Sequence, residues 1–159
     1  ALRLLNTGKV YNAAEKAWSA IENFRKACLV VAKIPYDVAK TVRDGIPLFS
    51  KILEKLGRND LLRMYFYFNS RLHSLGFYER VIPEEDIAKV IREEVPKWLE
   101  NIEQIINTLK LIDLSETVDI LRKINQARQE VLKASIKYAE LRRKLDTIIS
   151  NKISIILNK

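Results

Sequence analysis

Few residues in this chain have side chains suited to catalysis or metal binding. The sequence contains one histidine, His73, and one cysteine, Cys28. A zinc or other soft-metal site usually needs three or four such ligands, and Ser-His-Asp or Cys-His catalysis would have to use this one histidine. Cys28 precedes the apolar run 29–32, which is typical of a small buried hydrophobic residue. We therefore predict no metal, no cofactor and no catalytic residue, and we expect a reducing, cytoplasmic setting.

Basic side chains offer a different chemistry, the binding of an anionic partner. The formal net charge is +8, and it is unevenly spread: residues 83–112 carry four Lys and Arg against seven acids, whereas residues 113–159 carry ten against six. Nucleic acid is the first candidate partner, and the alternative is an ordinary solvated face. The residues that we expect to contact phosphate lie on the last helix: Arg122, Lys123, Lys133, Arg142, Arg143 and Lys144.

The composition places these residues on helices. The 159 residues include only four Gly and four Pro and are rich in Ile, Leu, Lys, Glu and Arg, which is typical of helical proteins and also of thermophile proteins. The sequence predicts an all-α fold: an antiparallel helical bundle over residues 1–112 and a long C-terminal helix within residues 113–159, packed on the bundle or on a partner. No stretch reaches the ~18 apolar residues of a membrane span, so we expect no membrane association.

The apolar spacing divides the bundle into its helices. Steps of three and four from Val10 to Val31 predict the first helix. Residues 38–56 predict a second, which Gly45 and Pro47 should interrupt or kink. Residues 60–80 are apolar nearly all round, which is typical of a central helix that touches neighbours on several faces. Another helix follows over residues 83–112, with a bend expected near residues 92–96, at its internal proline.

The last helix, predicted over residues 116–157, carries a narrow apolar strip. Its apolar residues alternate in steps of four and three for four heptads, the pattern of a coiled coil. We call this strip the seam: Ile120, Ile124, Ala127, Val131, Ala134, Tyr138, Leu141, Leu145 and Ile148. Because a long uncovered strip is rare on a monomer, we predict a homo-oligomer or a helical protein partner. The alternative is that this helix folds back onto its own bundle.

Short motifs in the middle of the chain resemble the archaeal PaREP family. The pair Leu72-His73, the motif Phe77-Tyr78-Glu79 and the acidic helix start at residues 83–87 occur in the order seen in that family. Residues 14–18, Ala-Glu-Lys-Ala-Trp, are similar to its first helix. The likeness covers roughly residues 9–110. It implies a small helical bundle related to the HEPN proteins, some of which are ribonucleases.

The ribonuclease motif of HEPN proteins, an Arg and a His separated by four to six residues, does not carry over. Arg71 has one residue between it and His73, and Arg63 has nine, which separates Arg63 from His73 by ~15 Å along a helix. We therefore expect His73 to be packed or hydrogen-bonded near Tyr78 or Glu79, with a pH-switching or ligand-binding role as the alternative.

Two classes of function follow from the sequence. The first is a non-catalytic helical interaction or oligomerisation module that acts through the seam. The alternative is a nucleic-acid-binding protein that uses basic helix surfaces, or a degenerate HEPN-type ribonuclease or nucleotidyltransferase accessory subunit. Salt dependence of nucleic-acid binding separates the two classes, because phosphate contacts weaken steeply with salt.

Overall fold

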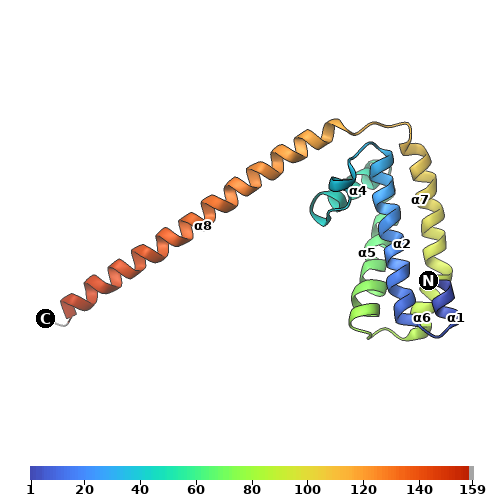
Figure 1. Cartoon of the computed structure of the whole chain (residues 1–159), viewed down its shortest axis with the longest axis horizontal. Coiled ribbons are helices and arrows are strands. Elements are labelled where there is room, and N and C mark those ends of the chain that lie inside the picture. The colour runs from blue at the N-terminus through green and yellow to red at the C-terminus, as the bar shows by residue number, and fades with distance from the viewer. Residues whose placement is uncertain (158–159) are drawn as a thin grey trace. The chain divides into compact units, whose positions relative to one another are not determined.

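A computed structural model describes the backbone of residues 1–157 and the side chains of residues 1–148 except Thr117. All regular structure in this part of the chain is helical (Figure 1), so the all-α prediction is confirmed. The chain divides into two compact units. Unit 1, Ala1–Val118, is a bundle, and the described part of unit 2, from Asp119 to Leu157, is the rest of the long C-terminal helix.

Unit 1 contains seven α-helices and two π-helical segments among the described residues. They are α1 (Leu2–Asn6), α2 (Val10–Val31), α3 (Tyr36–Ala39), α4 (Val42–Lys55), α5 (Asn59–Phe68), η1 (Asn69–Tyr78), α6 (Glu84–Lys89), η2 (Val90–Glu94) and α7 (Val95–Leu109). The segment η1 continues α5 directly, and η2 joins α6 to α7. The last helix, α8 (Glu116–Leu157), has the predicted bounds.

The central helix of the bundle is α2. It contacts α1, α3, α4, α6, α7 and both π segments, and it lies between α5 and α7 in Figure 1. Small buried residues such as Ala13, Ala14 and Ala17 let neighbouring helices approach α2 closely. The prediction that residues 60–80 form the central helix is wrong, because that helix leaves Phe66 47% exposed and Tyr78 67% exposed.

The predicted break at Gly45 and Pro47 is also wrong, since α4 runs through both residues. The chain breaks earlier, where Thr41 caps α4 by accepting a hydrogen bond from the Asp44 N–H at 3.1 Å. The glycine instead permits a close helix contact: a Cβ at Gly45 would lie 2.2 Å from the Ala39 carbonyl oxygen. Pro47 has no backbone N–H, so α4 lacks one hydrogen bond near its start, and the helix continues in spite of this loss.

An irregular turn lies where the bend near Pro96 was predicted. The residues just before Pro96 form η2, in which backbone bonds span five residues instead of four. A proline has no N–H to offer the carbonyl of Arg92, and a π turn is one of the ways in which a helix accommodates such a loss. The position of the irregularity is therefore as predicted.

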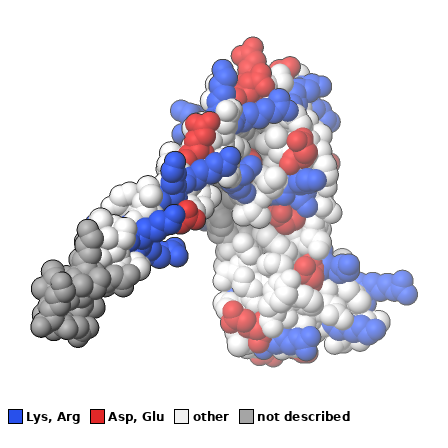
Figure 2. All heavy atoms as spheres, turned by 60° about the vertical axis from the view of Figure 1, so that its left-hand side comes forward, with Lys and Arg blue, Asp and Glu red and all other residues white. Residues whose placement is uncertain are grey.

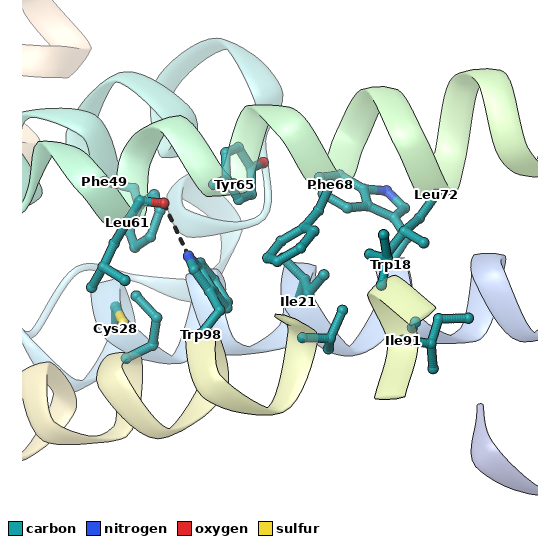
Figure 3. Close-up of a cluster of buried hydrophobic side chains, with 14 of the residues drawn as sticks. Trp18, Ile21, Cys28, Phe49, Leu61, Tyr65, Phe68, Leu72, Ile91 and Trp98 are labelled. Carbon is teal, nitrogen blue, oxygen red and sulfur yellow. Dashed lines mark hydrogen bonds between the residues drawn. The ribbon is translucent and has the colours of Figure 1, made fainter. Parts of the chain in front are cut away.

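The core joins α2 to α5, η1 and α7 through large side chains (Figure 3). Trp98 of α7 is almost fully buried, and its indole N–H donates to the Leu61 carbonyl at 2.9 Å. Trp18 and Cys28 are buried as well, so the prediction that Cys28 is a small buried hydrophobic residue is confirmed. Burial raises the pKa of the Cys28 thiol to about 12, which keeps the thiol protonated and unreactive.

Candidate functional site

The polar residues of unit 1 meet where α2 packs against α5 and η1. On α2, Glu15, Trp18, Glu22 and Arg25 are separated by three, four and three residues, a spacing that places them on one helix face. Tyr65, Asn69 and His73 come from α5 and η1 at spacings of four. A π turn holds more residues than the 3.6 of an α turn, so η1 keeps residues four apart close to one face. We call these seven residues the polar stripe.

Arg25 is the buried charge of the polar stripe, and like Tyr65 it has none of its surface exposed. Its guanidinium donates to both carboxylate oxygens of Glu22, at 2.9 and 3.0 Å, and to the Ala39 carbonyl at 2.9 Å. The Tyr65 hydroxyl also donates to Glu22, at 2.5 Å. The buried ion pair therefore ties α2 to α5 and to the end of α3.

These contacts set the protonation of Glu22 and Tyr65. Burial acts to raise the pKa of Glu22, but the hydrogen bonds from Arg25 and Tyr65 and the Arg25 charge outweigh it, so the pKa lies below its usual value. The pKa of Tyr65 lies well above its usual value because of burial and of the hydrogen bond to Glu22. Glu22 is therefore ionised and Tyr65 neutral at physiological pH.

His73 lies at the other end of the polar stripe. Its Nδ1 is 2.8 Å from the carboxylate of Glu15, its ring stacks on Trp18 with a centroid distance of 5.7 Å, and its other contact is edge-on with Tyr78 at 4.9 Å. The expectation that His73 is packed and hydrogen-bonded beside Tyr78 is confirmed. The partners Glu15 and Trp18 were not predicted, because they are nearly sixty residues away in the sequence.

A pocket of about 190 Å³ opens along the polar stripe. It is lined by Trp18, Glu22, Val42, Ile46, Tyr65, Asn69 and His73. The Glu15 carboxylate beside the His73 imidazole could orient a general base. The other two titratable groups that line the pocket, Glu22 and Tyr65, are already hydrogen-bonded to each other. The two arginines nearest His73 in sequence have other ring contacts: Arg71 lies over Tyr67 at 5.8 Å and Arg80 over Tyr11 at 5.6 Å. No described contact brings an arginine to His73.

The family-motif residues differ in burial, although Tyr78 is in ring contact with both His73 and Phe77. Leu72 is in the core, His73 and Phe77 are half-buried, and Tyr78 and Glu79 are exposed. Arg25 and Glu22 were not among the predicted site residues, although the sequence contains a signal for them. Arg25 lies four residues after Ile21 and three before Cys28, which is a core position of an amphipathic helix. A charge at such a position requires a buried partner.

The basic residues singled out on α8 are all exposed. Arg122 pairs with Asp119 at 3.2 Å and Arg142 with Asp146 at 3.6 Å. At 3.6 residues per turn, Arg122, Lys133 and Lys144 lie along one face of the helix, whereas Arg142 lies on the far side of the seam from them. On the face of unit 1 in Figure 2, Lys and Arg alternate with Asp and Glu.

The seam residues are exposed along α8, with the larger ones 42% to 68% exposed. The described residues of unit 2 form part of a single helix, so none of them folds back to cover the seam. Within the described residues, no helix is long and apolar enough to cross a membrane. In the same part of the chain, no three His, Cys, Asp or Glu side chains are placed to hold a metal ion.

Comparison with known proteins identifies the family. No curated protein and no solved structure matches the chain. The model of the archaeal PaREP1/PaREP8 family matches residues 1–99, a span that runs from α1 into α7 and includes every residue of the polar stripe. The match covers more than half of the chain, and it agrees with the resemblance found in the motifs around His73. The chain therefore belongs to the archaeal PaREP1/PaREP8 family.

Proposed function

We propose that this protein is a non-catalytic helical interaction module that associates with copies of itself through α8. The observation that carries the proposal is the seam, an apolar strip with no cover inside its own unit. From Ile120 to Ile148 the seam is about 42 Å long. An apolar strip of that length is larger than soluble monomers usually leave in water, and such strips mark protein contacts.

The features of unit 1 support a structural rather than a catalytic role. The buried charges of the polar stripe are used in hydrogen bonds between helices. His73 contacts a carboxylate and two rings, but no described nucleophile or arginine. The pocket beside these residues therefore lacks the pair of groups that an HEPN-type ribonuclease would need.

Light scattering on the full chain tests self-association. We expect a mass that is a multiple of 18.5 kDa. The double variant Leu141→Lys, Leu145→Lys should be a folded monomer, because it places charges in the seam. Leu132→Lys with Ile136→Lys is the matched control, since these residues are equally exposed on α8 but lie outside the seam. A monodisperse monomer of the unmodified chain at tens of micromolar would contradict the proposal.

Binding of nucleic acid is the second candidate, favoured by the three aligned cations of α8. Arg122, Lys133 and Lys144 are eleven residues apart, close to three helical turns, so they form a line beside the seam. Affinity for a random duplex should fall steeply with salt, and replacing all three by Gln should lower the salt slope by about three. An absence of binding at low salt would remove this candidate.

A further inference from the structure

We propose that the seam pairs with the seam of a second copy in antiparallel orientation, with Ala127 of one copy opposite Tyr138 of the other. This inference rests on the proposed function and specifies the partner. It follows from the sizes of the seam residues and from the charges that flank them. The seam repeats every 3.5 residues, which makes two such helices wind around each other with a left-handed twist.

The seam residues differ in size in a way that favours the antiparallel pair. In a parallel pair each residue meets its own copy, so Tyr138 would face Tyr138, while Ala127 and Ala134 would each face another alanine. One layer would be overfilled and two would be nearly empty, and both faults destabilise a core. In the antiparallel pair the bulky Tyr138 fills the space left by Ala127 of the second copy.

The remaining layers of this arrangement are also filled. Ile120 faces Leu145 of the second copy, and Ile124 faces Leu141. At the centre Val131 faces Ala134, where the two backbones can approach closely. Twofold symmetry repeats each of these layers, so the pair contains eight apolar layers. Only the layer of Ala127 and Tyr138 pairs a small residue with a large one, and the outer layers pair Ile with Leu, so no layer contains two bulky aromatic residues or two alanines.

The flanking charges favour the same orientation. One flank of the seam carries Lys123, Glu130, Lys137 and Lys144, and the other carries Arg128, Ser135 and Arg142. A parallel pair places opposite flanks together. It would bring Lys123 to Arg128 and Lys137 to Arg142 of the second copy, each twice, with no opposite-charge pair. Like charges at these positions act against pairing.

The antiparallel pair places like flanks together and gains attractive contacts. Glu130 then meets Lys137 of the second copy, twice by symmetry, while Arg128 meets Ser135. One kind of like-charged contact remains, between Lys123 and Lys144, and symmetry repeats it as well. A shift by one heptad would keep two attractive contacts, between Glu130 and Lys144, but would bring Arg128 to Arg142 twice and Lys137 to its own copy. The register in which Ala127 faces Tyr138 therefore has one like-charged contact fewer than the shifted one, and the charges favour it.

Cysteine cross-linking in the full-length protein tests both orientation and register. A disulfide needs Cβ atoms within about 4.5 Å. In the proposed pair, Ile124 and Leu141 of opposite copies meet that condition, but each lies ~25 Å along the axis from its own copy. The variant Ile124→Cys, Leu141→Cys should therefore form a covalent dimer in a glutathione buffer, and Leu141→Cys alone should not. Native Cys28 can stay, because it is buried and its thiol is unreactive.

The cysteine variants distinguish the possible orientations and registers of the helix pair. Leu132→Cys, exposed and outside the seam, reports cross-linking by random collision. A dimer that cross-links through Leu141→Cys alone is parallel and overturns the inference, while self-association stands. A dimer that cross-links only in Val131→Cys, Leu141→Cys has the shifted register and also overturns it. A monomeric unmodified chain in light scattering overturns the proposed function itself.

Discussion

Arg25 is the residue whose removal should damage the bundle most. It is fully buried, and it holds the Glu22 carboxylate and the Ala39 carbonyl. In Arg25→Met the carboxylate loses its ionic partner while it remains mostly buried. We expect the free energy of unfolding to fall by about 3 kcal/mol, the lower end for a broken buried pair, because Glu22 keeps some contact with water.

Denaturant unfolding of Arg25→Met measures this loss. The double variant Arg25→Met, Glu22→Leu is the control, because it removes both charges and should recover a large part of the stability. A single variant as stable as the unmodified protein would show that the Glu22 carboxylate does not depend on Arg25.

Glu22 should also give the bundle a sensitivity to acid. Its pKa is lower in the folded protein than its usual value of 4.5, so the folded state binds the proton less well than the unfolded state does. The resulting stabilisation is complete above the unfolded pKa and is lost as pH falls through the folded pKa. Unfolding curves measured between pH 7 and pH 3 should therefore show a loss of stability that is smaller in Glu22→Gln. Equal acid sensitivity of the two proteins would contradict this role.

The candidate site was only partly predictable at the level of residues. The burial of Cys28 followed from its place beside an apolar run. The packing of His73 near Tyr78 was also expected. The partners of His73 could not be predicted, since Glu15 reaches it across the interface of two helices. A carboxylate on a half-buried helix face has the same local sequence pattern whether it faces water or an imidazole.

At the scale of elements, Gly45 is the residue that lets α4 pack against the end of α3. An alanine is usually better than glycine in a helix by about 1 kcal/mol. Here its Cβ would lie 2.2 Å from the Ala39 carbonyl oxygen and 2.7 Å from Arg25 Nη1. Gly45→Ala should therefore destabilise the protein by about 1–3 kcal/mol. Thermal unfolding measures the change, with Glu54→Ala on the exposed side of α4 as control. A stabilising Gly45→Ala would mean that α3 moves away at little cost.

Gly45 also shows why α4 was harder to predict from the sequence than the other helices. Regular apolar spacing predicted α2, α7 and α8, because each carries one continuous apolar face, which α2 and α7 bury in the bundle. Gly45 and Pro47 instead suggested a break, since local propensity treats both as helix breakers. Tertiary contact overrides that propensity here: the missing Cβ is what admits the Ala39 carbonyl. The contacts between helices make α2 the central helix instead of α5. The apolar pattern of a single helix does not show these contacts.

At the scale of the whole molecule, we expect no intrinsic ribonuclease activity. His73 is the only histidine of the chain, and no described contact joins it to an arginine. Cleavage assays on RNA, with and without added divalent metal, should show no turnover above buffer. The His73→Asn variant serves as the control for contaminating nuclease. Turnover that is abolished by this change, in a protein with unaltered unfolding behaviour, would overturn the prediction.

The two π segments, η1 and η2, have a consequence for how the length of this chain can vary. Each π turn contains one residue more than the α turn that could replace it. Deleting a single residue there would leave an ordinary α-helix, whereas a deletion within α2 would turn all later side chains away from their partners. Natural relatives that differ by one residue inside the bundle should therefore differ within 69–78 or 90–94. In the first case the shortened helix would also turn Tyr65 and His73 out of alignment, so such relatives should lack the contact with Glu15.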